Sequence, residues 1–346
     1  MTIVEADRAV TGGVDTHADV HVAAALDPIG GLLGVESFAA TTAGYTQLAE
    51  WMGEFGPVAK VGVEGTGAYG AGLARFLRHV GIEVIEVDRA NRQARRQRGK
   101  SDPADALEAA RAAQDGRARG IAKSRDGTVE AIRTLTVARR SAQHTRIATL
   151  NQMRQLCFTA PDEIRDRFRG SSAGALAEQT AALRPRPSQD PVMFATYTTL
   201  RTLGRRVRYL EEELGRVDDL LGELVGPYVP ELMALRGVGV QTAASLVVAA
   251  GDNPERVRTE AAWAHLCGVA PIEASSGKVT RYRLDRGGNR QANKALWTIV
   301  MVRMSNDART RDYVERRTKE GRSKREIIRV LKRYVAREVY RHLPRP

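Results

Sequence analysis

Short apolar runs alternate with helix-like spacing along the first third of the chain. The strand-like runs are separated by turn-forming residues, as at 27–31, where Asp, Pro and Gly lie together. Between the later runs, apolar residues recur every three or four positions, as in a helix that buries one face. The predicted elements are a strand ending at Asp15, strands at Val20–Ala25 and Leu32–Phe38, a helix at Thr41–Phe55, a strand at Lys60–Glu64, a helix at Tyr69–Val80 and a strand at Glu83–Val87.

This order of elements indicates the fold of the first domain. Three strands followed by alternating helices and strands are typical of an RNase H-like α/β sheet. A further helix is expected to begin near Asp102. We therefore expect an α/β catalytic domain of this fold over residues 1–125.

The pattern changes to long helices from about residue 128. Apolar residues step by three and four from Leu200 to Leu224 without a break, which is the seam of a coiled coil. An earlier helix at Val129–Leu156 is a candidate antiparallel partner. Residues 126–228 are thus predicted to form a long helical coiled-coil insert, either a hairpin buried within one chain or a stalk that joins two chains.

A third, mainly α-helical domain is expected over residues 229–346. The segment Leu235–Val240, followed by the apolar helix Thr242–Ala250, resembles a helix-hairpin-helix, whose turn offers backbone N–H groups to DNA phosphates. A plain turn between two helices fits this segment equally well. The basic helix that begins at Ser323 has its apolar residues on one face, so we expect it to be docked on the domain.

The charge balance favours a polyanionic partner. Lys and Arg number 54 against 41 Asp and Glu, which gives a formal net charge of +13. Each contact between such a protein and a phosphate releases counterions, and this release drives binding to nucleic acid. A basic protein with no nucleic-acid role is the alternative on charge alone.

No segment predicts export or a membrane span. Cys157 and Cys267 lie far apart and form no disulfide or metal-ligand pattern, so a reduced cytoplasmic compartment is expected. The first nine residues include two acids and do not resemble a signal peptide. The apolar run Ala243–Ala250 is far shorter than the ~20 residues of a membrane helix.

Four carboxylates fall at the ends of predicted elements. Asp15 ends the first strand and Glu64 ends the fourth, and these strands are neighbours in an RNase H-like sheet. Asp102 and Asp105 lie three residues apart at the start of a helix, on one face. Such a cluster suits Mg²⁺ or Mn²⁺, which stabilises the attacking and leaving oxygens of phosphodiester cleavage. We predict that these four residues hold the catalytic metal.

Each carboxylate also has a structural explanation. Asp102 before Pro103 is a good helix N-cap, with Asp105 in the first turn. Glu64 is also consistent with a plain strand end, and Asp19 is the nearest rival to Asp15. The metal prediction depends on all four positions coinciding.

Cationic runs lie beside two of the candidate segments. A charge run is usually a solvated face, but the first run leads directly into the acidic pair at 102–105, which favours a track for the phosphate backbone. The expected nucleic-acid contacts are Arg92, Arg95, Arg96, Arg98 and Lys100 in the first run, and Lys278, Arg281, Arg283, Arg286 and Arg290 in the second.

Ser276 lies in a Gly/Ser loop ahead of the second cationic run. A serine hydroxyl can attack a phosphodiester when cations stabilise the charge that develops on phosphorus. Ser-Gly is also common in ordinary loops, and no base is evident beside it. The residues alone therefore leave a nucleophile and a simple loop serine open.

Five motifs, in a single order, cover nearly the whole chain. They are Gly13-Val14-Asp15, Val63-Glu64-Gly65-Thr66-Gly67, Lys100-Ser101-Asp102-Pro103-Ala104-Asp105-Ala106, Gly237-Val238-Gly239, and Gly268-Val269-Ala270-Pro271 with Ser276-Gly277. With these motifs the chain resembles the DEDD transposases of the IS-one-ten type of insertion sequence, which include the related Piv invertases.

The resemblance implies a RuvC-like N-terminal domain joined by a coiled coil to a transposase domain. It implies that Asp15, Glu64, Asp102 and Asp105 are the metal-binding tetrad, and that Ser276 is the nucleophile that becomes linked to DNA. Ser275 competes for this role; Ser276 is preferred because it directly precedes the glycine and keeps the family's distance from Pro271.

The resemblance also implies the partners and the setting. They are target and donor DNA, a structured guide RNA from the element, and further copies of the chain in a dimer or tetramer, in a prokaryotic cytoplasm with action at the nucleoid. We expect the tetrad and the serine to form a composite site, from one protomer or from two. The alternatives are a RuvC-like nuclease that uses water, a protein-guided DNA invertase, and a nucleic-acid-binding protein without activity.

Overall fold

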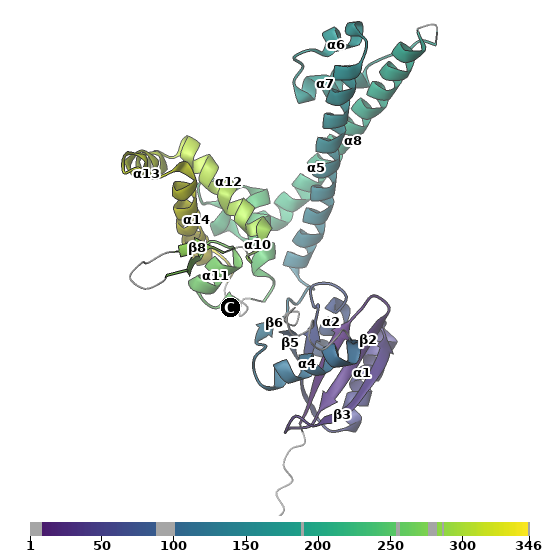
Figure 1. Ribbon diagram of the computed structural model, residues 1–346, viewed down its shortest axis with the longest axis vertical. Coiled ribbons are helices and arrows are strands. Elements are labelled where there is room, and N and C mark those ends of the chain that lie inside the picture. Colours follow the sequence, from purple (N-terminus) through teal and green to yellow (C-terminus); the bar gives the residue numbers. More distant parts are fainter. Residues whose placement is uncertain are drawn as a thin grey trace, which may run out of the picture. The chain divides into compact units, whose positions relative to one another are not determined.

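The computed structural model describes residues 9–87, 101–187, 190–253, 257–275, 282–285 and 287–344 (Figure 1). The chain divides into two compact units. The N-terminal unit comprises Met1–Glu130, Ala250–Trp263 and Pro344–Pro346, and the C-terminal unit comprises Ala131–Ala249 and Ala264–Leu343. The expected division at residues 125 and 228 stays a prediction.

The N-terminal unit is built on a mixed six-stranded sheet in the order β3-β2-β1-β4-β5-β6. The first three strands run antiparallel to one another, β4 and β5 join parallel to β1, and β6 returns antiparallel. The strands are β1 (Val10–Thr16), β2 (Val20–Leu26), β3 (Leu32–Ala39), β4 (Val58–Glu64), β5 (Glu83–Val87) and β6 (Gly120–Ile121). The α/β fold expected from the sequence is confirmed, and the short strand β6 is an addition to it.

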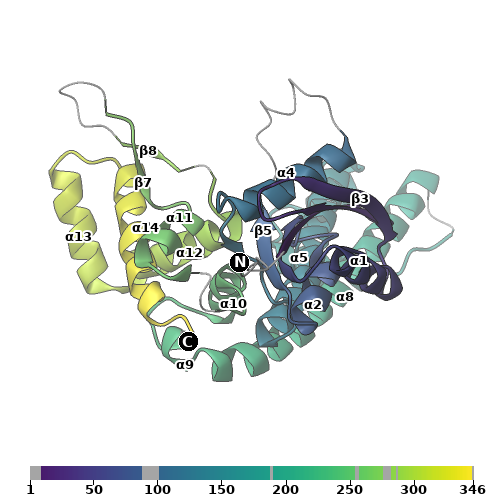
Figure 2. The same cartoon turned by 90° about the horizontal axis from the view of Figure 1, so that it is seen from below.

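Helices cover both faces of this sheet (Figure 2). They are α1 (Thr42–Glu54), α2 (Ala71–His79) and α4 (Asp102–Gln114). Side chains from α1 and α2 form one core with Val14, Val61 and Val63 of the sheet. Since successive strand residues point to opposite faces, Gly13 and Gly62 face the other way, toward α4.

Helix α4 lies in direct backbone contact with the sheet. Gly13 and Gly62 are register partners on β1 and β4. A Cβ at Gly13 would lie 2.1 Å from the Ala110 nitrogen, and one at Gly62 would lie 2.5 Å from the Ala109 oxygen. The face that α4 turns to the sheet is buried and made of alanines, namely Ala106, Ala109, Ala110 and Ala113. Only glycine fits between these strands and the helix, so the two strands hold α4 at a fixed, short distance from the sheet.

The predicted heptad seam is buried inside the chain. It lies on α8 (Pro191–Tyr228), which runs antiparallel to α5 (Thr128–Thr159). Two ion pairs join these helices: Arg139 to Asp218 at 2.6 Å, and Arg146 to Glu211 at 2.5 Å. The buried residues of the seam are Leu200, Val207, Leu210, Leu214 and Leu221. The seam packs within this chain as a hairpin, and a role as a stalk that joins two chains stays a prediction.

Two short helices that were not predicted connect α5 to α8. They are α6 (Asp162–Phe168) and α7 (Ala173–Ala181). Helix α7 crosses α8 at Gly204, where a Cβ would lie 2.6 Å from the Ala181 nitrogen. A glycine inside the heptad region therefore marks a close helix crossing.

The rest of the C-terminal unit is mainly helical, as expected. Its elements are α9 (Pro230–Met233), α10 (Val240–Ala250), α11 (Glu260–Leu266, which spans the boundary between the units), β7 (Pro271–Glu273), β8 (Tyr282–Leu284), α12 (Arg290–Asn306), α13 (Ala308–Lys319) and α14 (Lys324–Arg341). The basic helix α14 begins with a capping box between Ser323 and Glu326, and it buries one apolar face that includes Ile327 and Leu331. No helix in the described part of the chain is long and apolar enough to cross a membrane.

The glycine-rich turn that resembles a helix-hairpin-helix packs against α12. Gly237 adopts a φ of 81°, which favours glycine. A Cβ at this position would lie 3.2 Å from the carbonyl oxygen of Ile299. This glycine thus serves the packing of the domain, and a role for the turn in DNA binding stays a prediction.

The contact of α4 with the sheet predicts the effect of single methyl groups. Gly13→Ala should lower the free energy of unfolding by about 1–3 kcal/mol or more, because the new methyl group overlaps the α4 backbone. Urea unfolding followed by circular dichroism measures the loss. The matched control is Gly53→Ala on α1, where a Cβ meets nothing within 4 Å; it should leave stability unchanged or raise it. Equal effects of the two substitutions would contradict the account.

Candidate metal centre

Asp15 and Glu64 lie on the sheet face that α4 covers. They stand two residues beyond the register partners Gly13 and Gly62, and strand residues two apart point to the same face. Both carboxylates are buried, with 6% and 8% of their surface exposed. The structure therefore places these two acids on neighbouring strands, as the pattern of the sequence predicted.

The first turn of α4 holds the other two carboxylates. Asp105 is buried and Asp102 is partly exposed. The helix N-cap is Ser101, whose hydroxyl accepts a hydrogen bond from the Ala104 nitrogen at 3.4 Å. The alternative in which Asp102 caps the helix is wrong, because Ser101 occupies that position. Neither aspartate has the capping role, although both are favourably placed near the positive end of the helix dipole.

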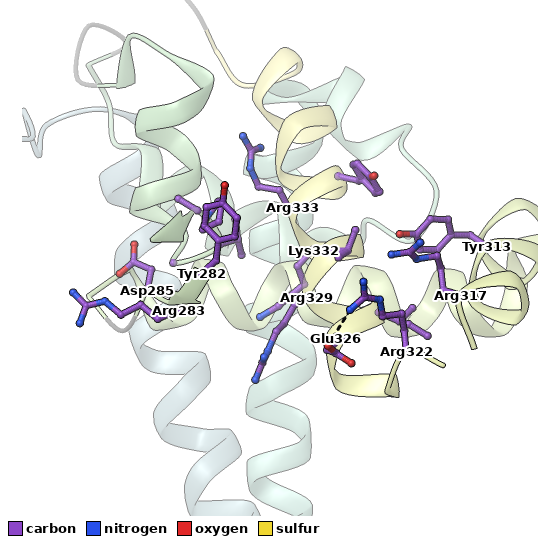
Figure 3. A pocket seen from close by; sticks show the side chains of 17 residues that line it. Tyr282, Arg283, Asp285, Tyr313, Arg317, Arg322, Glu326, Arg329, Lys332 and Arg333 are labelled. Atoms are coloured by element: carbon purple, nitrogen blue, oxygen red, sulfur yellow. Dashed lines mark ion pairs between the residues drawn. The ribbon is translucent and has the colours of Figure 1, made fainter. Parts of the chain in front are cut away.

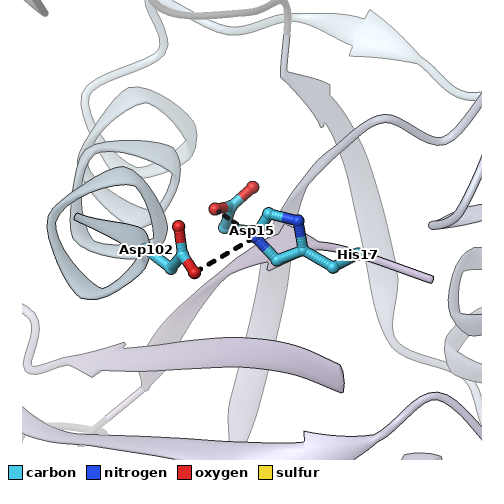
Figure 4. Close-up of side chains that lie close together, drawn as sticks. All are labelled: Asp15, His17 and Asp102. Carbon is cyan, nitrogen blue, oxygen red and sulfur yellow. Dashed lines mark ion pairs between the residues drawn. The ribbon is translucent and has the colours of Figure 1, made fainter. Parts of the chain in front are cut away.

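An imidazole joins the end of β1 to the start of α4. The Nε2 atom of His17 lies 3.2 Å from Asp15 Oδ2 and 3.4 Å from Asp102 Oδ2 (Figure 4). One ligand atom from each of these three residues lies within 4.8 Å of the others. The structure thus brings Asp102 beside two residues from the end of β1 that lie far from it in the sequence.

Negative charge accumulates around Asp15. Burial raises the pKa of Asp15 above its usual value, and the nearby carboxylates of Asp105 and Asp102 raise it further. His17 acts in the opposite direction and lowers this pKa. Asp105 is therefore close enough to interact electrostatically with the cluster. A cation in the cluster would relieve the repulsion among these acids.

The cluster is consistent with a metal site. Asp15 Oδ2 and His17 Nε2 are buried, and neither makes a hydrogen bond within the described part of the chain. These two atoms lie 3.2 Å apart without hydrogen-bond geometry. Carboxylate oxygens are the ligands that hard divalent cations prefer, and neutral imidazole is a common metal ligand. Two carboxylates and one imidazole therefore offer a suitable donor set.

His17 was missed in the sequence. The signal was its position two residues after Asp15, directly beyond the end of the strand. A histidine beside a strand-end aspartate is a candidate ligand for the same ion.

The turn after Glu64 is held by side chains from other elements. Thr16 donates its hydroxyl to the Glu64 carbonyl at 2.8 Å, and Gly65 follows with a φ of 72°. The guanidinium of Arg125 donates to the Gly67 carbonyl at 2.8 Å. These contacts set the backbone direction where β4 delivers Glu64.

The remaining candidate residues are only partly described. Arg283 is exposed on β8, and Arg290 is the first residue of α12. Ser276 lies outside the described residues, as do Arg92, Arg95, Arg96, Arg98, Lys100, Lys278, Arg281 and Arg286.

The strand order and the acidic cluster together place the N-terminal unit among the RNase H-like domains. Two family descriptions match the chain in order. Residues 12–158 match the DEDD domain of the IS110 type, described as a transposase, and residues 229–315 match the description "Transposase IS116/IS110/IS902 family". Together they cover more than half of the chain. The chain belongs to the IS110 family of transposases, the IS-one-ten type that its motifs resemble.

A relative from Streptomyces coelicolor agrees with this assignment. It is the "Insertion element IS110 uncharacterized 43.6 kDa protein", and it is 31% identical over 150 residues. The match covers 43% of this chain and 36% of the relative. The chain thus matches only about a third of the length of that protein.

The geometry predicts which aspartates affect metal affinity. Asp102→Asn should weaken binding of Mn²⁺ by roughly tenfold or more, since even residues that only support metal ligands contribute about 10- to 100-fold. Isothermal titration calorimetry measures this change. The matched control is Asp19→Asn, because Asp19 is exposed in the turn after β1 and lies outside the cluster. Unchanged affinity in Asp102→Asn, or an equal loss in both variants, would contradict the assignment.

Proposed function

We propose that this chain is an active transposase that cuts and rejoins DNA strands with a divalent metal. The observation that carries the proposal is the cluster of Asp15, His17 and Asp102 at the edge of an RNase H-like sheet, in a member of a transposase family. The ion is proposed to be Mg²⁺ or Mn²⁺, because the surrounding donors are mainly carboxylate oxygens.

Asp15, Glu64, Asp102 and Asp105 are proposed as the residues that hold the ion, with His17 as an addition to the set. When bound, the metal supplies positive charge that stabilises the oxygens of the reacting phosphate. The protein contributes the placement. The carboxylates come from two strand ends and from the start of one helix. The contact of α4 with Gly13 and Gly62 fixes the position of the helix relative to the strands.

Ser276 is proposed as the nucleophile on the basis of the family motif. Its Oγ would attack phosphorus and form a serine phosphodiester as one strand oxygen leaves. The proton of the serine hydroxyl ends on that leaving oxygen. A free hydroxyl of another strand then attacks the same phosphorus, releases the serine and restores its proton. The number of phosphodiester bonds is conserved, so no external energy source is required.

The main alternative is a RuvC-like nuclease in which metal and water cut the strand. This reaction leaves free ends and no bond to the protein. The two mechanisms use the same acidic cluster, so loss of activity in Asp15→Ala does not separate them. The two mechanisms differ in whether the cut strand is covalently bonded to the protein.

The serine proposal predicts a protein–DNA adduct. Wild-type protein incubated with labelled DNA of its element should give a band of retarded mobility on a denaturing gel. Ser276→Ala should abolish the band, whereas Ser275→Ala should retain it, which makes the neighbouring serine the matched control. Free cut ends without an adduct in the wild type would favour the nuclease. An adduct that survives Ser276→Ala but is lost in Ser275→Ala would move the role to Ser275.

We also propose that the chain acts as a homo-oligomer with target DNA, donor DNA and a structured guide RNA. This part rests on the family resemblance, and the net charge of +13 suits such polyanionic partners. The expected result is a single enriched RNA from the insertion element when RNA that copurifies with the protein is sequenced. Recombination by protein that has been freed of all RNA would favour a protein-guided invertase instead.

A further inference from the structure

A basic cleft of about 550 Å³ lies within the C-terminal unit. Its walls come from the β7–β8 hairpin, from α13 and from α14 (Figure 3). The two strands on one side are those that flank the loop of Ser276 in the sequence. None of the cleft residues belongs to the candidate metal centre.

Positive charge predominates along the cleft. Six cationic side chains line it, against the two carboxylates of Asp285 and Glu326. They are Arg283, Arg317, Arg322, Arg329, Lys332 and Arg333. Arg322 pairs with Glu326 at 3.7 Å and Arg317 pairs with Glu320, whereas Arg283 and Arg329 have no ion-pair partner within the described residues. The charge of the cleft is therefore only partly neutralised by the protein.

Lys332 adds a half-buried ammonium group to the cleft. Its Nζ donates a hydrogen bond to Asn293 Oδ1 at 2.9 Å, and Asn293 in turn donates to the Cys267 carbonyl at 2.8 Å. Burial lowers the pKa of Lys332 below its usual value, and the positive charge of Arg329 lowers it further. An anion bound in the cleft would offset both effects. The site thus favours a ligand with negative charge.

Aromatic rings accompany these cations. Tyr282 on β8 is 62% exposed, and its ring has no aromatic partner among the described residues. Tyr313 lies on the other side of the α14 cations (Figure 3). It packs edge-on against Tyr334, and Arg316 lies over its ring. Tyr282 is therefore the ring of this cleft that is most available to a ligand.

A second hollow of about 340 Å³ shares Gly268 and Asp285 with the cleft. It is lined by Arg290, Lys294 and Trp297, and Trp297 is 45% exposed. Alternation of cations with exposed rings is the pattern of surfaces that bind single strands, because each nucleotide offers a phosphate and a flat base. The two hollows suit a strand rather than an isolated anion.

We propose that this cleft binds an unpaired segment of nucleic acid, with a base stacked on Tyr282 and phosphates on Arg283, Arg329 and Lys332. Bases inside a duplex are stacked on their neighbours and cannot lie on a tyrosine ring without leaving the helix. The ligand is therefore a single-stranded stretch, such as one exposed when strands are exchanged. The inference rests on the proposed action on DNA, and it names the form of the nucleic acid that the C-terminal unit holds.

Fluorescence anisotropy with the full chain tests the stacking contact. The probes are a labelled single strand of DNA, an RNA strand of the same sequence, and the DNA duplex, all in EDTA so that no strand is cut. Tyr282→Ala should weaken single-strand binding by roughly tenfold and leave duplex binding unchanged, while Tyr282→Phe should retain affinity because it keeps the ring. The matched control is Tyr209→Ala on α8, where the tyrosine is 60% exposed.

The outcomes for these probes are distinct. Selective loss with DNA, with RNA or with both supports the cleft as a single-strand site and identifies the source of the strand. Unchanged single-strand affinity in Tyr282→Ala overturns the proposal. Equal losses for single strand and duplex, or a loss as large in Tyr209→Ala, also overturn it.

Salt dependence tests the phosphate contact. Arg329→Gln should reduce the slope of log affinity against log salt for the single strand by about 0.7, the value for one phosphate contact on a single strand. Arg206→Gln on the exposed side of α8 is the control and should leave the slope unchanged. Unchanged slopes in both variants would overturn the role of Arg329.

These measurements are independent of the proposed catalysis. If Asp15→Asn protein lacks activity but shows binding that depends on Tyr282, the cleft is supported whatever the metal does. If the wild type forms the serine adduct but Tyr282→Ala leaves the single-strand affinity unchanged, the proposed function stands and the cleft proposal fails.

Discussion

The backbone of α4 rests on two glycines, and the acidic centre depends on that contact. Gly13 and Gly62 leave no room for a Cβ beneath the helix, and α4 meets them with a face of alanines. The height of the helix above the sheet is thus set by main-chain atoms, which do not change rotamer. Because α4 begins with Asp102, this contact also determines where its first carboxylates lie relative to Asp15. Larger side chains under α4 would separate the helix from the strand ends.

The same closeness creates an electrostatic cost. Asp15 is buried, and Asp102 and Asp105 face it from the helix, so their charges repel one another. His17 lies between two of the carboxylates and offsets part of that repulsion. The C-terminal unit has the opposite character, with cations and exposed rings around its cleft. The net charge of +13 is therefore unevenly distributed, with an acidic centre in one unit and a basic surface in the other.

Periodicity in the sequence predicted the N-terminal fold well because its strands are short, apolar and bounded by turns. It also placed Asp15 and Glu64 at strand ends, since strand alternation carries over from sequence to structure.

His17 was missed because it follows the predicted strand. The cap at Ser101 was misassigned because Asp102 before Pro103 fits the same rule for a helix N-cap. Helices α6 and α7 are short and lack a strong pattern, and the packing of α7 on α8 depends on the single residue Gly204. Whether the helices α5 and α8 also join two chains could not be predicted, because a heptad seam does not identify its partner.

The contact of α4 with β1 and β4 is proposed to build a divalent metal site. The most direct test is anomalous diffraction from crystals of the protein soaked in Mn²⁺. We expect a strong anomalous peak within ligand distance of Asp15 and Asp102, with His17 or a further carboxylate completing the set. A clear map of that region with no peak between these residues, or a peak held by residues elsewhere, would contradict it.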